Sequence, residues 1–417
     1  MPRGTPVTIT RPAPLEATAA VAVPARWIWL AAWPVTAVFV LSNAATPLYA
    51  LWQRDIGFSK GTMTVVFACY IVGLIGSLLV SGVVSDRVGR KPVLLPALGL
   101  AVLACGIFAT ATSVAALMAA RLFTGVAVGA VVSAGMAAVT DVAGPERKRL
   151  GALLASCAMV LGAGLGPLLA GVLSETLPGP TATVFLVEIA LLALAFVTVL
   201  RMPVPRPSGA GGGGGVGAGA WIRLPKVPRG SGRQLFLGIA VFAPGITSTS
   251  FVLSLGPSLL SGLLGTTSRV VAGAMAFVMF LAATGVQFAV KGLRVRGILV
   301  GGAVSVVAGM VALMAAVWTS SVVLLAAAAV LAGAGQGMGQ LGGLSLLNST
   351  VPGTRLAEAN AALNVGGYVP AGALPVAAGY LSDGIGLTGG ATTFAVVLGV
   401  LGAVGGGVAA RLGPARG

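Results

Sequence analysis

The sequence predicts an all-α integral membrane protein built from two six-helix bundles, and three observations support this fold class. Only 8% of the 417 residues are charged while 57% are hydrophobic, and the mean hydropathy is +1.02; soluble proteins carry about a quarter charged residues. Apolar runs of about 20 residues, the length that crosses a bilayer as an α-helix, occur twelve times after residue 27. A Gly- and Pro-rich segment divides them into two groups of six.

The first six runs form the predicted N-terminal bundle at 27–202, and the other six form the C-terminal bundle at 234–411. The expected spans are 27–50, 61–84, 92–111, 114–139, 150–173, 183–202, 234–260, 269–290, 297–318, 321–350, 357–381 and 389–411. Between the bundles, residues 203–233 are rich in Gly, Pro and Arg, which predicts a flexible cytosolic linker. Residues 1–26 lack an apolar core and are expected to be a disordered cytosolic tail, with a second tail at 412–417.

The net charge of +16 indicates membrane topology. Basic residues gather in the N-terminal tail, after residue 410 and in alternate loops, namely 85–91, 140–149, 201–233, 291–296 and 351–356. The opposite loops hold little beyond Arg54 and Lys60, so the positive-inside rule places both termini in the cytosol. Nucleic-acid binding would need a basic face with stacking aromatics and is not expected. The abundance of Ala, Gly, Val and Arg favours a bacterial source, and therefore the inner (plasma) membrane.

Histidine is absent, which excludes a Ser-His-Asp triad, an imidazole metal site and a histidine proton relay. The three cysteines, Cys69, Cys105 and Cys157, each lie inside an apolar run and are expected to be small buried hydrophobes. We therefore expect no metal, no disulfide and no cofactor, and any proton carrier must be a carboxylate. No G-x-x-x-x-G-K-[ST] loop occurs, which disfavours ATP-driven chemistry.

The loop between the second and third spans, GVVSDRVGRKP at 82–92, places an acid among several bases. Asp86 can pair with these bases or face a helix N-terminus. Gly82 and Gly89 allow the backbone to approach closely, and Pro92 is suited to begin the next helix. An ordinary positive-inside loop would explain the bases but not the acid and the glycines, so we interpret the segment as a charge latch.

This segment resembles the signature loop of the major facilitator superfamily, which reads Gly, three residues, Asp-Arg, one residue, Gly-Arg-Lys. The resemblance implies a fold of two pseudo-symmetric six-helix bundles and transport by alternating access. It assigns closure of the cytosolic side to Asp86 and Arg90, with Arg87 in the same motif and Asp141 as the expected partner of Arg90. The corresponding segment of the second half matches this pattern only in part, because Ala289 takes the place of the acid.

The fourth span places Arg121, a permanently charged side chain, inside the membrane. Its insertion costs about 2.5–3.5 kcal/mol, so a partner or a water-filled cavity is expected. The segment RLFTGVAVG at 121–129 is similar to the superfamily's fourth-helix motif, which implies a role in proton coupling. The alternative is that the side chain snorkels to the outer interface.

Two carboxylates are further candidates for proton coupling. Glu188 lies well inside the sixth apolar run, where an acid is a functional candidate by default. Its alternatives are a structural hydrogen bond or an ion pair with Arg121. Asp55, just beyond the first span, is the reserve candidate, and simple solvation in the loop is its alternative.

The fifth span contains a glycine face with a proline. It resembles the antiporter motif of drug and proton exchangers at Gly162, Gly166, Pro167 and Gly171, and it departs from that motif at Leu153 and Ala170. Packing of small residues is the alternative explanation. The resemblance favours proton-coupled export of a small amphipathic molecule such as a drug, antibiotic or metabolite. A proton-coupled importer is the first alternative, and a membrane-embedded enzyme is disfavoured because paired intramembrane carboxylates and histidines are missing.

In the superfamily the first, fourth, seventh and tenth helices line the cavity, and the eleventh is a further source of polar residues here. The resemblance points to Asn43, Thr247, Ser250, Gln336, Gln340, Asn360, Asn364 and Tyr368 as candidate ligand-binding residues. Each could instead cap or bridge helices. Few acids face this cavity, so a neutral, amphipathic or weakly anionic small molecule fits better than a cation. Protons, this small molecule and the lipid bilayer are the expected partners of a monomer.

Overall fold

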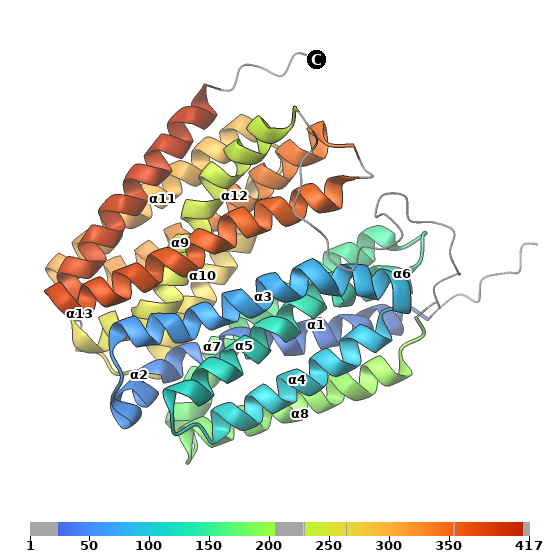
Figure 1. Ribbon diagram of the computed structural model, residues 1–417, viewed down its shortest axis with the longest axis horizontal. Coiled ribbons are helices and arrows are strands. Elements are labelled where there is room, and N and C mark those ends of the chain that lie inside the picture. Colours follow the sequence, from blue (N-terminus) through green and yellow to red (C-terminus); the bar gives the residue numbers. More distant parts are fainter. Residues whose placement is uncertain (1–23, 205–227, 229, 264, 353–354, 412–417) are drawn as a thin grey trace, which may run out of the picture.

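The computed structural model describes residues 24–204, 228, 230–263, 265–352 and 355–411, and every regular element in these ranges is helical (Figure 1). Eleven continuous helices there are long and apolar enough to cross a membrane. The predicted C-terminal tail, all but three residues of the N-terminal tail and most of the predicted linker lie outside the described residues.

The first half of the chain forms six membrane-length helical paths. Its elements are α1 (Arg26–Ala44), η1 (Thr46–Leu48), α2 (Tyr49–Trp52), η2 (Gln53–Gly57), α3 (Lys60–Val88), α4 (Lys91–Ala109), α5 (Val114–Ala130), η3 (Val131–Gly135), α6 (Met136–Ala143), α7 (Lys148–Thr176) and α8 (Pro180–Arg201). The first path extends to Gly57, beyond the expected 27–50, because a 3-10 turn that begins next to Pro47 and a π-turn continue the helix. The fourth path similarly passes through the π-turn η3 to Ala143.

The second half contains α9 (Gly232–Gly262), α10 (Arg269–Val290), α11 (Val295–Thr319), α12 (Val322–Thr350) and α13 (Leu356–Ala410). The continuous α13 differs from the two spans expected at 357–381 and 389–411. Its 55 residues would extend about 80 Å as one straight helix, far beyond a bilayer core of roughly 30 Å. Gly386, with φ 84° and ψ 163°, breaks the helical path, and the chain reverses direction between the orange and red parts of α13 in Figure 1. The eleventh and twelfth spans are therefore present but joined without a loop.

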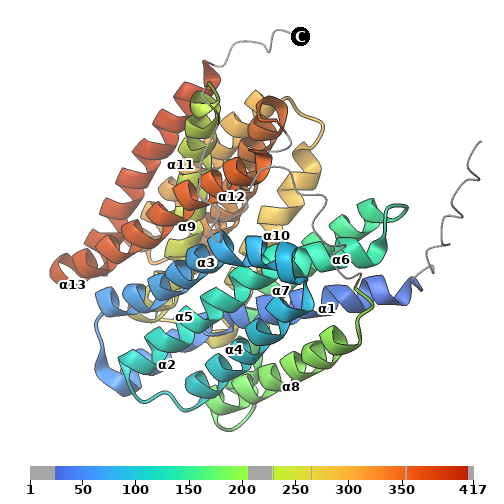
Figure 2. The ribbon, with the colours of Figure 1, turned by 45° about the vertical axis from the view of Figure 1, so that its right-hand side comes forward.

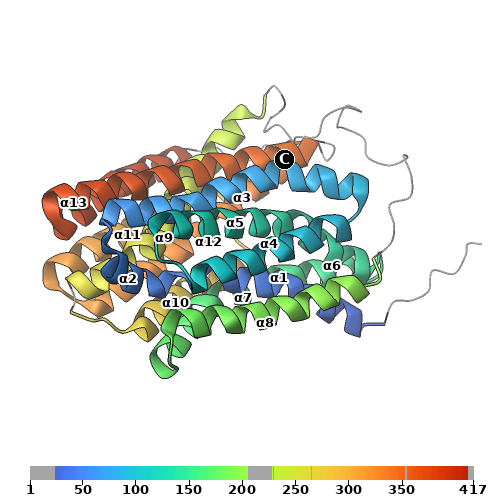
Figure 3. The same cartoon turned by 60° about the horizontal axis from the view of Figure 1, so that its bottom comes forward.

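The two halves lie side by side, with their helices running roughly along a common direction (Figures 2 and 3). The first helical path of each half, Arg26–Gly57 and Gly232–Gly262, is the most enclosed, with 78% of its most apolar window buried. Helix α7 packs against α10, and α3 packs against α13, so these two pairs join the halves. Leu186, Val311 and Val400 are among the large apolar side chains left exposed on the outside, as expected for a surface that meets lipid.

Because successive spans alternate in direction, all helix ends fall into two groups. We call the end that holds Arg26, the α3–α4 turn and Arg411 the terminal end. The opposite end, which holds the α4–α5 turn and Gly386, is the distal end. These names carry no assumption about which side of a membrane each end faces.

Candidate functional site

At the terminal end, the α3–α4 turn gathers the residues of the predicted latch. The Arg90 guanidinium donates from Nε to Asp141 at 2.8 Å, and from Nη1 to Asp86 at 2.6 Å and to Ser85 at 2.9 Å. Gly89 has φ 97°, a value that favours glycine, and so allows the sharp turn between the two helices. The ends of α3, α4 and α6 are thereby tied together within the first half.

Two carboxylates on one guanidinium make a stronger arrangement than a single surface ion pair. Partial burial alone would lower the pKa of Arg90, but the hydrogen bonds and charges of Asp141 and Asp86 raise it above its ordinary value. Arg87 is exposed on the same turn, and Gly82 is half-buried one turn before Asp86 on α3. The functional role of this group stays a prediction.

Arg121 on α5 is completely buried, with 0% of its surface exposed, so the side chain does not snorkel to an interface. Its Nε donates to the Tyr49 hydroxyl, and its Nη1 donates to the backbone oxygen of Ser42 at 2.7 Å. Four aromatic rings lie within 5.1–6.0 Å of its Cζ atom, those of Tyr49, Phe67, Tyr70 and Phe108. Cation–π attraction from these rings stabilises the buried charge.

No ion pair between Arg121 and a carboxylate is present among the described residues, and its Nη2 atom has no hydrogen-bond partner there. The charge of Arg121 predicted a partner or water, but nothing in the sequence predicted the aromatic cage. The rings come from α2, α3 and α4, and no local pattern links them to Arg121. The pair with Glu188 that the sequence left open is not formed in this state.

Glu188 on α8 is only 3% exposed, and its Oε2 atom has no hydrogen-bond partner within the described part of the chain. It lies one turn from Phe185, whose ring stacks on Phe108 with the centroids 4.8 Å apart. It is therefore inside the first half and not at the contact between halves. Asp55, by contrast, has 58% of its side chain exposed and pairs with Arg54 at 2.9 Å.

The glycines of the antiporter-like motif, which lies in the fifth span (α7), face two different neighbouring helices. Gly162 and Gly166 touch the backbone of α1, and a Cβ atom on Gly166 would overlap the carbonyl oxygen of Val40. Gly171 lies against the start of α10, and the Pro167 carbonyl lies against Gly273 of α10. The motif therefore supports close packing both inside the first half and between the halves.

A cavity of about 320 Å³ lies between α3, η3 and α13. Its lining residues, all in the terminal-side part of their helices, are Ile75, Leu78, Leu79, Val132, Ser133, Asn360, Ala361, Asn364, Val365 and Tyr368. Three of the candidate binding residues are among them, Asn360, Asn364 and Tyr368. The apolar residues of α3 could not be predicted as cavity lining from the sequence, because any membrane helix has many leucines and isoleucines.

The other five candidate binding residues do not line this cavity. Asn43 is 6% exposed and donates to the Ser42 hydroxyl at 2.9 Å. Thr247 and Ser250 are buried in α9, while Gln336 and Gln340 are half-buried in α12. Thr247 Oγ1, Gln336 Oε1 and Asn360 Oδ1 are buried without a hydrogen-bond partner among the described residues. Since an unsatisfied buried polar atom costs about 1–3 kcal/mol, each of these atoms favours a nearby water or ligand group.

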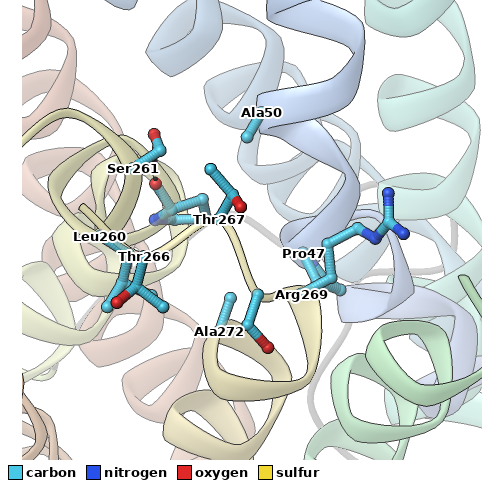
Figure 4. A pocket seen from close by; sticks show the side chains of 10 residues that line it. Pro47, Ala50, Leu260, Ser261, Thr266, Thr267, Arg269 and Ala272 are labelled. Carbon is cyan, nitrogen blue, oxygen red and sulfur yellow. Dashed lines mark hydrogen bonds between the residues drawn. The ribbon is translucent and has the colours of Figure 1, made fainter. Parts of the chain in front are cut away.

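At the distal end the halves meet more closely. A small pocket there has a volume of only about 20 Å³, and Figure 4 shows Pro47 and Ala50 of the first half facing Leu260, Thr267 and neighbouring residues of the second. Close to this pocket, the Ser258 hydroxyl donates to the side-chain oxygen of Gln53 at 3.3 Å across the halves. The large cavity thus opens on the terminal side of a distal contact.

A family model described as Major Facilitator Superfamily matches residues 28–296. Among curated proteins, 116 residues are 34% identical to the 3-(3-hydroxy-phenyl)propionate transporter of Escherichia coli (strain K12), covering 27% of this chain and 28% of that protein. A stretch of 94 residues is 29% identical to multidrug resistance protein MdtL of Escherichia coli O45:K1, covering 22% and 24%. The chain spans less than a third of the length of either relative.

Solved structures match over nearly the whole chain. A mutant of the nucleoside transporter NupG has a TM-score of 0.71 at 10% identity, covering 92% of this chain and 98% of its own. A bacterial homologue of the human lysosomal transporter Spinster, in an inward-facing and unoccupied conformation, has a TM-score of 0.70 at 14% identity, covering 94% and 99%. The human organic anion transporter MFSD10 has a TM-score of 0.62 at 18% identity, covering 93% and 99%. At these identities the likeness concerns the fold alone.

Proposed function

Because this chain belongs to the major facilitator superfamily, and is therefore a multi-pass membrane transporter and not an enzyme, we propose that it exports a small amphipathic molecule in exchange for protons. The two six-helix halves, 27–202 and 234–411, rock about a central site and expose it to one side at a time. A proton-coupled importer is the second candidate function.

The observation that carries the proposal is the unequal closure of the two ends. The cavity between α3, η3 and α13 lies on the terminal side, and the halves are joined by direct contacts at the distal end. A protein open at one end and closed at the other is what alternating access expects of one of its two end states. The cavity volume of about 320 Å³ lies at the lower end of the usual range for small-molecule sites.

Basic residues support the orientation of this cycle. They gather in the loops of the terminal end, so the positive-inside rule places that end in the cytosol and the cavity opens inward. The protein would then be a monomer in the inner membrane of a bacterium, with both termini cytosolic. An inward-open cavity is where an exporter loads its cargo.

The cavity lining favours an uncharged amphipathic cargo. Ile75, Leu78 and Leu79 of α3 supply an apolar wall, whereas Asn360, Asn364 and Tyr368 of α13 supply amide and hydroxyl groups spaced about one turn apart. No charged side chain lines this cavity among the described residues. A strongly cationic cargo would find no counter-charge there.

Export in exchange for protons has two supports. The glycine face of α7 resembles the antiporter motif, and its contact with α10 lies at the boundary between the two halves. One relative is also named as a multidrug resistance protein. We assign the proton to Glu188, whose buried carboxyl group has an oxygen without a partner in the described part of the chain, and treat Asp55 as the alternative. Arg121 then acts as a fixed positive charge within the same half.

Everted membrane vesicles test the proposal. The vesicles are given a proton gradient and a panel of fluorescent amphiphiles and antibiotics, with and without a protonophore. Protonophore-sensitive uptake into everted vesicles supports export by antiport. Accumulation by right-side-out vesicles, driven by an inward proton gradient, would instead establish the importer, and gradient-independent flux would contradict proton coupling.

A further inference from the structure

The fifth and eleventh spans end at the distal side with the same short pattern. It reads PLLAGVLSE at 167–175 on α7 and PVAAGYLSD at 375–383 on α13. Pro, Ala, Gly, Leu and Ser coincide, and both segments end in an acid. The two spans occupy equivalent places in the two six-helix halves, so the pattern is an internal repeat of the fold.

The acid of the second copy binds the start of a helix in the opposite half. Asp383 accepts a hydrogen bond from the Lys60 backbone N–H at 3.0 Å through Oδ1 and from the Gly61 N–H at 2.9 Å through Oδ2. These are the first two N–H groups of α3, which have no partner inside the helix. The Ser59 hydroxyl caps the same helix by accepting from Thr62 N–H at 3.1 Å.

The acid of the first copy, on the first half, likewise binds the start of a helix in the second half. Glu175 accepts hydrogen bonds from the backbone N–H groups of Arg269 and Val270, the latter at 3.2 Å. These are the first two N–H groups of α10, the eighth span, whose N-cap is Ser268. In addition, the Arg269 guanidinium donates from Nη2 to the backbone oxygen of Ser174 at 2.7 Å.

The glycine of each copy explains how the acid reaches its partner. Gly171 and Gly379 precede Glu175 and Asp383 by four residues and so lie on the same helix face. A Cβ atom on Gly379 would overlap the Thr64 hydroxyl on α3, and one on Gly171 would overlap the backbone of α10. Each glycine lets the two helices approach, and each acid then completes the contact one turn later.

We propose that Asp383 and Glu175 are a matched pair of clasps that hold the distal end of the transporter closed and that release when this end opens. Each clasp combines a negative charge with the positive end of a helix dipole and satisfies two otherwise unpartnered N–H groups. Released groups would meet water at the distal surface, so each clasp biases the closed state without making it permanent. The proposal rests on alternating access but not on the cargo, its direction or the proton.

The test measures the separation of the two halves directly. In full-length protein in lipid nanodiscs, with the native cysteines replaced by serine, spin labels are attached at Thr112→Cys and Thr319→Cys, exposed distal positions in the first and second half. Asp383→Ala, Glu175→Ala and the double variant are compared with Glu146→Ala, which removes an exposed acid at the terminal end. Each clasp variant should raise the long-distance population by roughly fivefold, a typical effect of losing a helix cap, and the double variant should raise it further.

An unchanged distance distribution in the folded double variant would overturn the proposal, as would an equal response in Glu146→Ala. If the alanine variants do not fold, the pairs Asp383→Asn with Glu175→Gln and Asp383→Glu with Glu175→Asp replace them. The amide pair should open the distal end because it removes both charges, and the carboxylate pair should stay closed. Identical distributions in these two pairs would also overturn it. Lack of flux in the wild type, with the clasp response intact, would instead count only against the proposed function.

Discussion

Arg90 and Asp141 lie 51 positions apart in the chain, yet the Arg90 Nε donates to the Asp141 carboxylate at 2.8 Å. The same guanidinium binds Asp86 at 2.6 Å, so one side chain fastens the terminal ends of three helices in the first half. We therefore expect Asp86→Asn to reduce the transport rate by about tenfold or more, since a hydrogen bond to a charged group contributes about 1.5–3 kcal/mol. Flux per inserted molecule is the measurement.

Asp141→Asn should weaken the other ion pair of the Arg90 guanidinium and reduce the transport rate by a similar factor. Glu146→Gln, on the adjacent loop, should leave the rate unchanged. Both latch variants should still insert normally in the membrane, because insertion depends on the apolar spans. Full transport by Asp86→Asn at normal membrane levels would remove the latch assignment.

A second prediction concerns the buried cation. Tyr49→Phe keeps the ring beside Arg121 but removes the hydroxyl that accepts from its Nε. Leaving a buried donor unsatisfied costs about 1–3 kcal/mol, and a charged donor costs more, so the thermal unfolding midpoint in detergent should fall. Tyr70→Phe is the matched control, since the Tyr70 ring lies 5.9 Å from the Arg121 Cζ atom without a hydrogen bond to the guanidinium. An equal change in both variants would contradict the assigned role of the Tyr49 hydroxyl.

The third prediction separates the two proton-carrier candidates. Glu188→Gln keeps the size of the side chain but cannot bind or release a proton, so transport should lose its dependence on pH and on the proton gradient. Downhill exchange of labelled cargo should continue. Asp55→Asn, at the solvent-exposed alternative, should behave as the wild type does. If Asp55→Asn loses the pH dependence and Glu188→Gln keeps it, Asp55 is the proton carrier.

A fourth prediction concerns cargo binding. Asn364→Ala should raise the KM for a transported amphiphile by about two- to tenfold, the effect of losing a hydrogen bond worth about 0.5–1.5 kcal/mol. The maximal rate should change less. Asn348→Ala on α12 serves as the control because this asparagine is exposed and does not line the cavity. A KM that stays constant for every transported compound would place the cargo elsewhere.

The fifth prediction concerns the glycine face of α7. Gly166→Ala should destabilise the protein by about 1–3 kcal/mol, since the new methyl group would overlap the Val40 carbonyl of α1 and force the helices apart. Gly99→Ala in α4 should be neutral or slightly stabilising, because a Cβ atom there meets nothing within 4 Å. The two variants differ only in their surroundings, so equal unfolding midpoints would mean that the α7–α1 contact has little importance.

Hydropathy alone predicted the membrane spans well, because a bilayer imposes the same length and composition on each of them. It could not predict that α13 runs through Gly386 without a loop, since one glycine in an apolar run is ordinary. The latch residues were accessible because they lie in one short motif. Arg121 was identified for its charge, but its aromatic cage depends on helix packing that no single segment encodes.

Glu175 and Asp383 were overlooked for a different reason. Acids at helix ends are normally solvated, and neither acid attracts notice alone. The signal was available in the paired sequences at 167–175 and 375–383, which become informative once their helices are known to be equivalent. The apolar wall of the cavity had no comparable signal.

The two ends of this transporter are fastened differently, and this difference has a kinetic consequence. The Arg90 group ties helices within one half, whereas the Asp383 and Glu175 contacts bridge the two halves. With the terminal end in the cytosol, as proposed above, an unloaded carrier would rest open inward and meet internal cargo at close to its intrinsic affinity. External cargo meets only the minor population, and its apparent affinity falls in proportion. The unequal fastening therefore gives the two sides different half-saturation concentrations, so external cargo fills the carrier only at a higher concentration than internal cargo does, while the direction of net transport still comes from the gradient.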